Sequence, residues 1–96
     1  MAIVHSYTMT AREGKEADLL AALEDLAKAA RGIAGSEGAV VLQDRKEPQT
    51  LLLLEMWDSE ESRGAAGKQL PKDVMARVMA AQGGPIKMAL WDRRAG

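Results

Sequence analysis

The sequence predicts a small α+β domain in which helices cover one face of an antiparallel sheet. Three observations lead to this fold class: a strand-like opening, a strongly amphipathic stretch over residues 15–31, and four consecutive leucines at residues 51–54. With 96 residues the chain has room for a single domain, residues 1–96. A chain this short buries only ~60–65% of its extended-chain surface, so a partner that covers further apolar area adds stability.

The first half of the chain reads as strand, helix, strand. Residues 2–10 favour a strand. Over residues 15–31 the apolar side chains recur at helical spacing, acidic residues occupy the first turn and basic residues the last, so we expect a helix there. The Gly-Ser-Glu-Gly stretch at residues 35–38 is expected to be a loop before a second strand at residues 39–44.

The second half reads as strand, helix, strand. Residues 51–57 are expected to form the third strand, and its leucine run places apolar side chains on both faces of the sheet. A helix that begins at Asp58 or Ser59 is expected to be poor, because glycines interrupt it. A better helix follows Pro71, and residues 86–92 give the last strand.

The resulting order, β-α-β-β-α-β, is the ferredoxin-like arrangement. With both helices on one face, the other face of the sheet stays bare and still carries leucines from the third strand. Pairing two such faces would bury roughly 1,500 Å² in total, which is the range of a stable dimer interface. We therefore expect a homodimer.

Composition excludes several classes of function. The chain has no cysteine and one histidine, His5, so disulfides, thiolate nucleophiles, zinc–thiolate sites and a histidine-only metal site are excluded. A net charge of -1 shows no basic excess, so we expect no nucleic-acid partner. No apolar stretch is long enough to span a membrane and no signal-peptide pattern is visible, so we expect no membrane contact and a cytoplasmic location.

Three motifs, in the correct order along the chain, resemble the antibiotic-biosynthesis monooxygenase family. Gly14-Lys15 lies where the family commonly has a Gly-Lys pair before its first helix. Ser36-Glu37-Gly38 takes the place of the family's Pro-Gly-Cys or Glu-Gly-Cys turn. The most specific match is the stretch from Glu55 to Ser59, which is similar to the family's Glu-x-Trp-x-Ser signature at the end of the third strand.

The resemblance implies a dimeric α+β barrel with a small-molecule pocket between sheet and helices. It also implies oxygenation of an aromatic polyketide-like or quinol compound without metal, flavin or haem, since an electron-rich phenolate can itself reduce O2. Polyketide-oxidising members have an Asn and a Tyr where this chain has Leu53 and Arg63. The haem-degrading branch has an Asn where this chain has Tyr7, and a later His that this chain lacks, so haem degradation is not expected.

Three residues are the candidates for catalysis. His5 has an ordinary pKa near neutrality and would act as general base, while the Tyr7 hydroxyl on the same strand face would orient the substrate anion. The indole N–H of Trp57 would hold a substrate oxygen. The structural alternatives are that His5 is a hydrogen-bonded strand residue near the dimer seam and that Trp57 anchors the core.

Further side chains are candidates for substrate binding. Glu55 would accept a proton or, as we favour, pair with Arg45 or Arg93 across the dimer interface. Leu53 shares the strand face of Trp57 and would line the pocket. We expect Met75 and Met79 to be core residues, although Met-lined pockets tolerate varied ligands. The basic side chains around the glycine-broken helix, a possible lid, would attract an anionic substrate: Arg63, Lys68 and Lys72.

The leading hypothesis is a homodimeric, cofactor-independent monooxygenase that acts on a small aromatic or quinol-type compound. Its polar pocket set would be His5, Tyr7 and Trp57. Two alternatives stay open: a non-catalytic small-molecule-binding or stress-associated dimer, and a non-oxidative, isomerase-like enzyme on the same scaffold.

Overall fold

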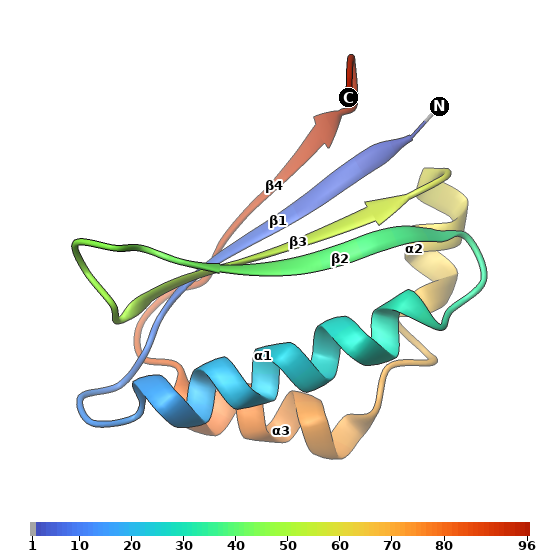
Figure 1. Cartoon of the computed structure of the whole chain (residues 1–96). Coiled ribbons are helices and arrows are strands. Elements are labelled where there is room, and N and C mark those ends of the chain that lie inside the picture. The colour runs from blue at the N-terminus through green and yellow to red at the C-terminus, as the bar shows by residue number, and fades with distance from the viewer. Residues whose placement is uncertain (1) are drawn as a thin grey trace.

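The computed structural model describes residues 2–96 and contains one four-stranded sheet with the strand order β2-β3-β1-β4 (Figure 1). The elements are β1 (Ile3–Thr10), α1 (Glu16–Arg31), β2 (Ser36–Gln43), β3 (Thr50–Trp57), α2 (Glu60–Ala66), α3 (Lys72–Ala81) and β4 (Lys87–Asp92). All three strand pairings are antiparallel. The expected α+β, ferredoxin-like fold is confirmed, with the second helical region divided into α2 and α3.

Alternation along the two central strands decides which side chains meet the helices. In β3 the residues that face α1 and α3 are fully buried, whereas those on the opposite side are half-buried. The β1–β3 register sets His5 opposite Glu55 and Tyr7 opposite Leu53, and residues opposite each other point to the same face. These four side chains therefore lie together between the sheet and the helices.

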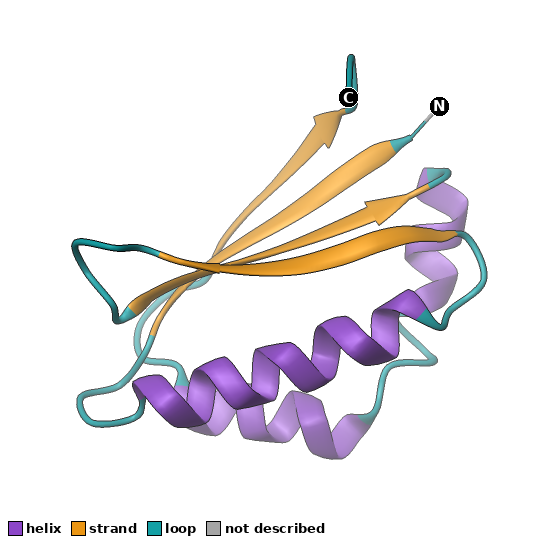
Figure 2. Cartoon of the chain, in the orientation of Figure 1, coloured by secondary structure: helices purple, strands orange, loops and turns teal. Residues whose placement is uncertain are grey.

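The core fills the layer between the sheet and the helices α1 and α3, which run side by side on one side of the sheet (Figure 2). Leu19 and Leu23 of α1 are completely buried, and so is Leu51 of β3. Several buried alanines on the same face of α1 let this helix approach the sheet closely. Helix α1 begins one residue after the expected start and ends where expected, so the periodicity argument was sound.

Helix α2 starts where expected, and a glycine fixes its position. Ser59 is the N-cap, and its hydroxyl accepts a hydrogen bond from the Ser62 N–H at 3.1 Å. Gly35 has φ 90°, and a Cβ at that position would clash with the Ser62 side chain. Only glycine therefore lets the loop before β2 pass so close to the first turn of α2, the helix that carries Arg63 to the site.

The start of β2 differs from the expected loop. Residues 36–38 belong to the strand, with an irregularity in the pairing to β3 between Ser36 and Gly38. Gly38 has φ 139°, which a bulge of this kind accommodates. The prediction of a loop was wrong here because the glycine and serine that signal a loop also occur at strand bulges.

None of the helices within residues 2–96 lies over the second face of the sheet (Figure 1). Leu52, Leu54 and Met56 of β3 are half-buried on it. Beside them, further apolar side chains are exposed, among them Leu42 at 50% and Trp91 at 58%. The face is therefore as apolar as the leucine run predicted. Among the described helices, none is long and apolar enough to cross a membrane.

Candidate functional site

A cavity of about 200 Å³ lies between the sheet and α3. Strands β1, β3 and β4 form one wall, and α1, α3 and the segment before α3 form the other. Its lining is apolar except for Tyr7 and Glu55. Five of the residues expected at the site line it: Tyr7, Leu53, Glu55, Met75 and Met79.

Four side chains meet at the polar end of this cavity. The Tyr7 Oη atom lies 2.7 Å from His5 Nδ1 and 3.4 Å from Glu55 Oε1. The Trp57 indole N–H donates to the same Glu55 oxygen at 3.4 Å. His5, Glu55 and Trp57 are buried, with 8%, 3% and 1% of their surface exposed. Tyr7 is therefore the member that connects the cavity with the buried imidazole behind it.

The hydrogen bonds indicate where the protons lie. The Tyr7 hydroxyl has one proton, and the distances make His5 its main acceptor at 2.7 Å and Glu55 a weaker second acceptor at 3.4 Å. Arg63, from α2, places Nη1 3.5 Å from the same His5 Nδ1 atom. A nitrogen that faces two donors must carry a lone pair, so we assign His5 the tautomer with its proton on Nε2.

Burial and charge shift the three titratable groups in different directions. Burial, followed by the charge of Arg63, lowers the pKa of His5 below its ordinary value of 6.5. Burial raises the pKa of Glu55 above its ordinary 4.5, although its hydrogen bonds to Trp57 and Tyr7 and the charge of Arg63 oppose this. Burial and Glu55 raise the pKa of Tyr7. At neutral pH Tyr7 therefore holds its proton, and His5 is free to accept one.

Two expectations about the site were wrong. Glu55 bonds to Tyr7 and Trp57, not to Arg45 or Arg93, because it lies on the helix-facing side of β3 and not on the bare face. Arg93 instead lies 3.7 Å from Glu37. Met75 and Met79 are not core residues, since 39% and 50% of their surface is exposed while they line the cavity.

The other expected residues divide into two groups. His5, Trp57 and Arg63 do not line the cavity: His5 contacts Tyr7, Trp57 donates to Glu55, and Arg63 contacts His5. Lys68 and Lys72 are exposed and line no part of the cavity. Six lining residues were not singled out from the sequence: Met9, Leu26, Leu70, Val78, Ile86 and Met88. The β1–β4 register places Met88 opposite Tyr7, and alternation along β4 alone does not show this.

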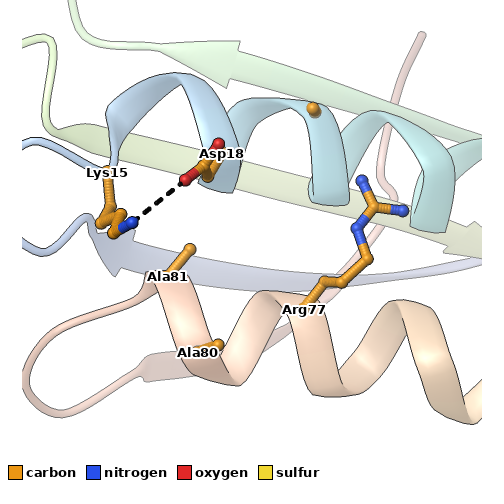
Figure 3. A pocket seen from close by; sticks show the side chains of 6 residues that line it. Lys15, Asp18, Arg77, Ala80 and Ala81 are labelled. Atoms are coloured by element: carbon orange, nitrogen blue, oxygen red, sulfur yellow. Dashed lines mark ion pairs between the residues drawn. The ribbon is translucent and has the colours of Figure 1, made fainter.

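A second hollow, of about 260 Å³, lies on the outer surface between α1 and α3 (Figure 3). It is lined by short alanine side chains and by charges that already have partners. Lys15 lies 3.5 Å from Asp18, and Arg77 lies 2.7 Å from Asp25. All four charged side chains are about half exposed or more, so this hollow offers no buried polar group for catalysis. Residues 2–96 also contain no cluster of His, Asp or Glu suited to a metal ion.

The shifted pKa of His5 can be measured directly, since this is the sole histidine of the chain. We expect nitrogen-15 NMR to show the Nε2-protonated tautomer at pH 7 and a pKa below 6.5. Arg63→Gln removes the nearby charge and should move this pKa back towards 6.5, whereas Arg63→Lys keeps the charge and should leave it low. If neutral His5 is the proton acceptor, the reaction rate should rise as the pH increases through this lowered pKa and should level off near neutrality. A wild-type pKa at or above 6.5 would contradict the assignment.

Comparison with known proteins places the chain among its relatives. Solved structures match it over nearly its whole length. SnoaB from Streptomyces nogalater, described as a cofactor-independent oxygenase, is 14% identical with a TM-score of 0.85, and the match covers 99% of this chain and 95% of that one. PA3566 from Pseudomonas aeruginosa is 20% identical with a TM-score of 0.82, over 98% and 95%. At these identities the likeness establishes the fold alone.

A structure from Chloroflexus aurantiacus J-10-fl, provisionally assigned as an antibiotic biosynthesis monooxygenase, is 26% identical with a TM-score of 0.83, over 100% of this chain and 96% of that one. No protein of curated function matches the chain. Residues 2–67 match the family model described as antibiotic biosynthesis monooxygenase. The chain thus belongs to the antibiotic biosynthesis monooxygenase family.

Proposed function

We propose that the chain is a cofactor-independent monooxygenase that acts on a small aromatic or quinol-type compound. The observation that carries this proposal is an apolar cavity whose polar end is the Tyr7 hydroxyl, with the His5 imidazole 2.7 Å behind it. An apolar cavity of ~150 Å³ is enough to hold benzene. The cavity of about 200 Å³ therefore suits one aromatic ring or two fused rings.

The arrangement supports removal of a proton from the substrate. A substrate hydroxyl at the polar end donates to Tyr7 Oη, which passes its own proton to His5 Nδ1 as it takes the new one. The net step moves one proton from the substrate to His5 and leaves a phenolate in the cavity. Burial and Glu55 raise the pKa of Tyr7, and the charge of Arg63 opposes this rise only in part, so Tyr7 relays the proton without itself becoming an anion. The same charge opposes the imidazolium, which keeps the proton ready to return.

The phenolate then supplies all the electrons that O2 needs. One electron passes to O2, and the resulting radicals combine to form a carbon–oxygen bond at a ring carbon. Cleavage of the O–O bond leaves one oxygen atom on the ring as a carbonyl and releases the other as water, which carries away the two hydrogens lost by the substrate. A phenol plus O2 thus gives a quinone plus water. The imidazolium of His5 returns its proton to the departing oxygen through Tyr7.

A second candidate function is isomerisation of a keto–enol pair without O2. The Tyr7–His5 contact favours it, because moving a proton between two substrate atoms needs no more than this relay. Leu53 and Arg63 also replace the Asn and Tyr that polyketide-oxidising relatives carry. The third alternative, a non-catalytic small-molecule-binding protein, would bind a ligand in the same cavity but catalyse neither oxygenation nor isomerisation. Oxygen consumption separates the leading function from both.

We also propose that two copies pair through the bare sheet face. Leu54 lies opposite Ser6 on one side and Val40 on the other, so it is in the middle of this face. The exposed Leu42 and Trp91 extend the apolar surface towards its edges. Covering the face would bury roughly 1,500 Å² in total, which suits a stable dimer. The cavity lies on the other side of the sheet and stays open.

Oxygen uptake tests the proposed reaction. With simple hydroquinones, and with anthrones as a second substrate, we expect the protein to consume one O2 per molecule oxidised. Tyr7→Phe keeps the ring but removes the relay, and should lower the rate by roughly 10²–10⁴-fold. Thr8→Val removes a neighbouring hydroxyl that points to the other face of β1, and should leave the rate unchanged. Equal rates for wild type and Tyr7→Phe would contradict the mechanism.

Sedimentation equilibrium tests the dimer. Leu54→Glu would place an unpaired carboxylate in the middle of the bare sheet face, which the proposed dimer buries. An unpaired buried charge costs about 3–5 kcal/mol, so dimerisation should weaken by at least ~100-fold. Ala21→Glu adds the same charge to the exposed side of α1 and should leave the dimer intact. A wild-type protein that sediments as a monomer, or a Leu54→Glu variant as dimeric as wild type, would refute this pairing.

A further inference from the structure

Three methionines line the cavity and are exposed at the same time. The exposed fractions are 39% for Met75, 50% for Met79 and 62% for Met88. Met75 and Met79 lie one turn apart on α3, and Met88 comes from β4 across the cavity. We call these three residues the methionine rim. Glu55, by contrast, is 3% exposed, so the rim marks the open end of the cavity and Glu55 its closed end.

The apolar surface continues beyond the rim along β4. Met88 lies opposite Tyr7 in the β1–β4 pairing, and Leu90 lies opposite His5, on the same face. Leu90 is 49% exposed. Single exposed apolar side chains are ordinary on protein surfaces, but a group of them that continues a cavity marks a place where a ligand lies.

The size and polarity of the cavity say which part of a ligand reaches the rim. The polar groups, Tyr7 and Glu55, are at the closed end and hold a hydroxyl there. A volume of about 200 Å³ leaves little room beyond one or two rings, so any substituent on the far side of the ring must project outwards. Projecting outwards, it meets only thioether and aliphatic side chains.

We infer that the substrate is a phenol or quinol with an apolar alkyl substituent, and that the methionine rim binds this chain. The inference rests on the proposed function, because it names the substrate class of the same site. Methionine side chains are unbranched and polarisable, so they fit chains of different length and branching. A charged or strongly hydrated substituent finds no polar partner among these three side chains, so the rim adds nothing to its binding.

A series of 4-alkylphenols, from 4-methylphenol to 4-hexylphenol, tests the inference. These probes are stable in air, and their chain points directly away from the hydroxyl. Isothermal titration calorimetry should show the dissociation constant falling about 2–4-fold with each added methylene, as expected for a CH2 group that is half to fully buried. The fall should stop once the chain extends past the rim.

Rim variants separate this contact from general hydrophobic binding. Met79→Gln and Met88→Gln should make the dissociation constant nearly independent of chain length, while binding of 4-methylphenol changes by no more than about twofold. Met79→Leu keeps the apolar surface and should retain the dependence. Leu42→Gln makes the same kind of change on the bare sheet face and serves as the matched control. Both methionines are at least half exposed, so each glutamine variant should unfold at the wild-type temperature.

The possible outcomes divide cleanly. The inference is overturned if the dissociation constant does not depend on chain length in wild type, or if it depends on chain length equally in wild type and in the glutamine variants. It is also overturned if these variants change the molecular mass in solution instead, because the rim would then belong to a contact between copies. Oxygen uptake with simple hydroquinones tests the reaction separately. If the protein takes up oxygen but its dissociation constants do not depend on chain length, only the inference about the rim fails. If the dissociation constants depend on chain length but no oxygen is taken up, only the proposed reaction fails.

Discussion

Strand β3 has apolar side chains on both faces, and the need to bury both organises the rest of the molecule. On the helix-facing side, Leu51 and Leu53 belong to the core that α1 and α3 cover, and Trp57 packs with Ala66 of α2. On the other face Leu52, Leu54 and Met56 have no helix over them. No described helix forms a third layer over this second face, which is why we propose that another copy covers it. One strand thus specifies both the core and the proposed dimer.

The same alternation places one carboxyl group inside the core layer. Glu55 follows Leu51 and Leu53 on the buried face of β3, where an isolated charge would be costly. The Tyr7 hydroxyl and the Trp57 indole compensate part of this cost at 3.4 Å each. Tyr7 in turn is held by His5, so the burial of one carboxyl gathers a phenol and an imidazole at the end of an apolar cavity. The polar group on which the proposed chemistry depends therefore follows from the way the sheet is packed.

Patterns in the sequence predict faces better than they predict contacts. The helix over residues 16–31 and the shared face of His5 and Tyr7 follow directly from periodicity. The partners of Glu55 do not follow from periodicity. Alternation along β3 shows that Glu55 shares a face with Trp57, but it does not show which strand lies beside Glu55. Met75 and Met79 have the same spacing as core residues, and only the position of α3 relative to β4 shows that they border an opening. The early start of β2 depends on a bulge that no local signal separates from a loop.

The central claim is that Tyr7 connects the cavity with His5, and one NMR titration tests it directly. Because the chain has a single histidine, both of its ring nitrogens can be followed in nitrogen-15-labelled protein as 4-methylphenol is added. A ligand hydroxyl that donates to Tyr7 should strengthen the bond from Tyr7 to His5. We therefore predict that the Nδ1 signal moves with ligand occupancy while the Nε2 signal changes little. If the ligand saturates the cavity, as seen from the Tyr7 ring signals, and both nitrogens stay unchanged, the connection is absent and the account fails.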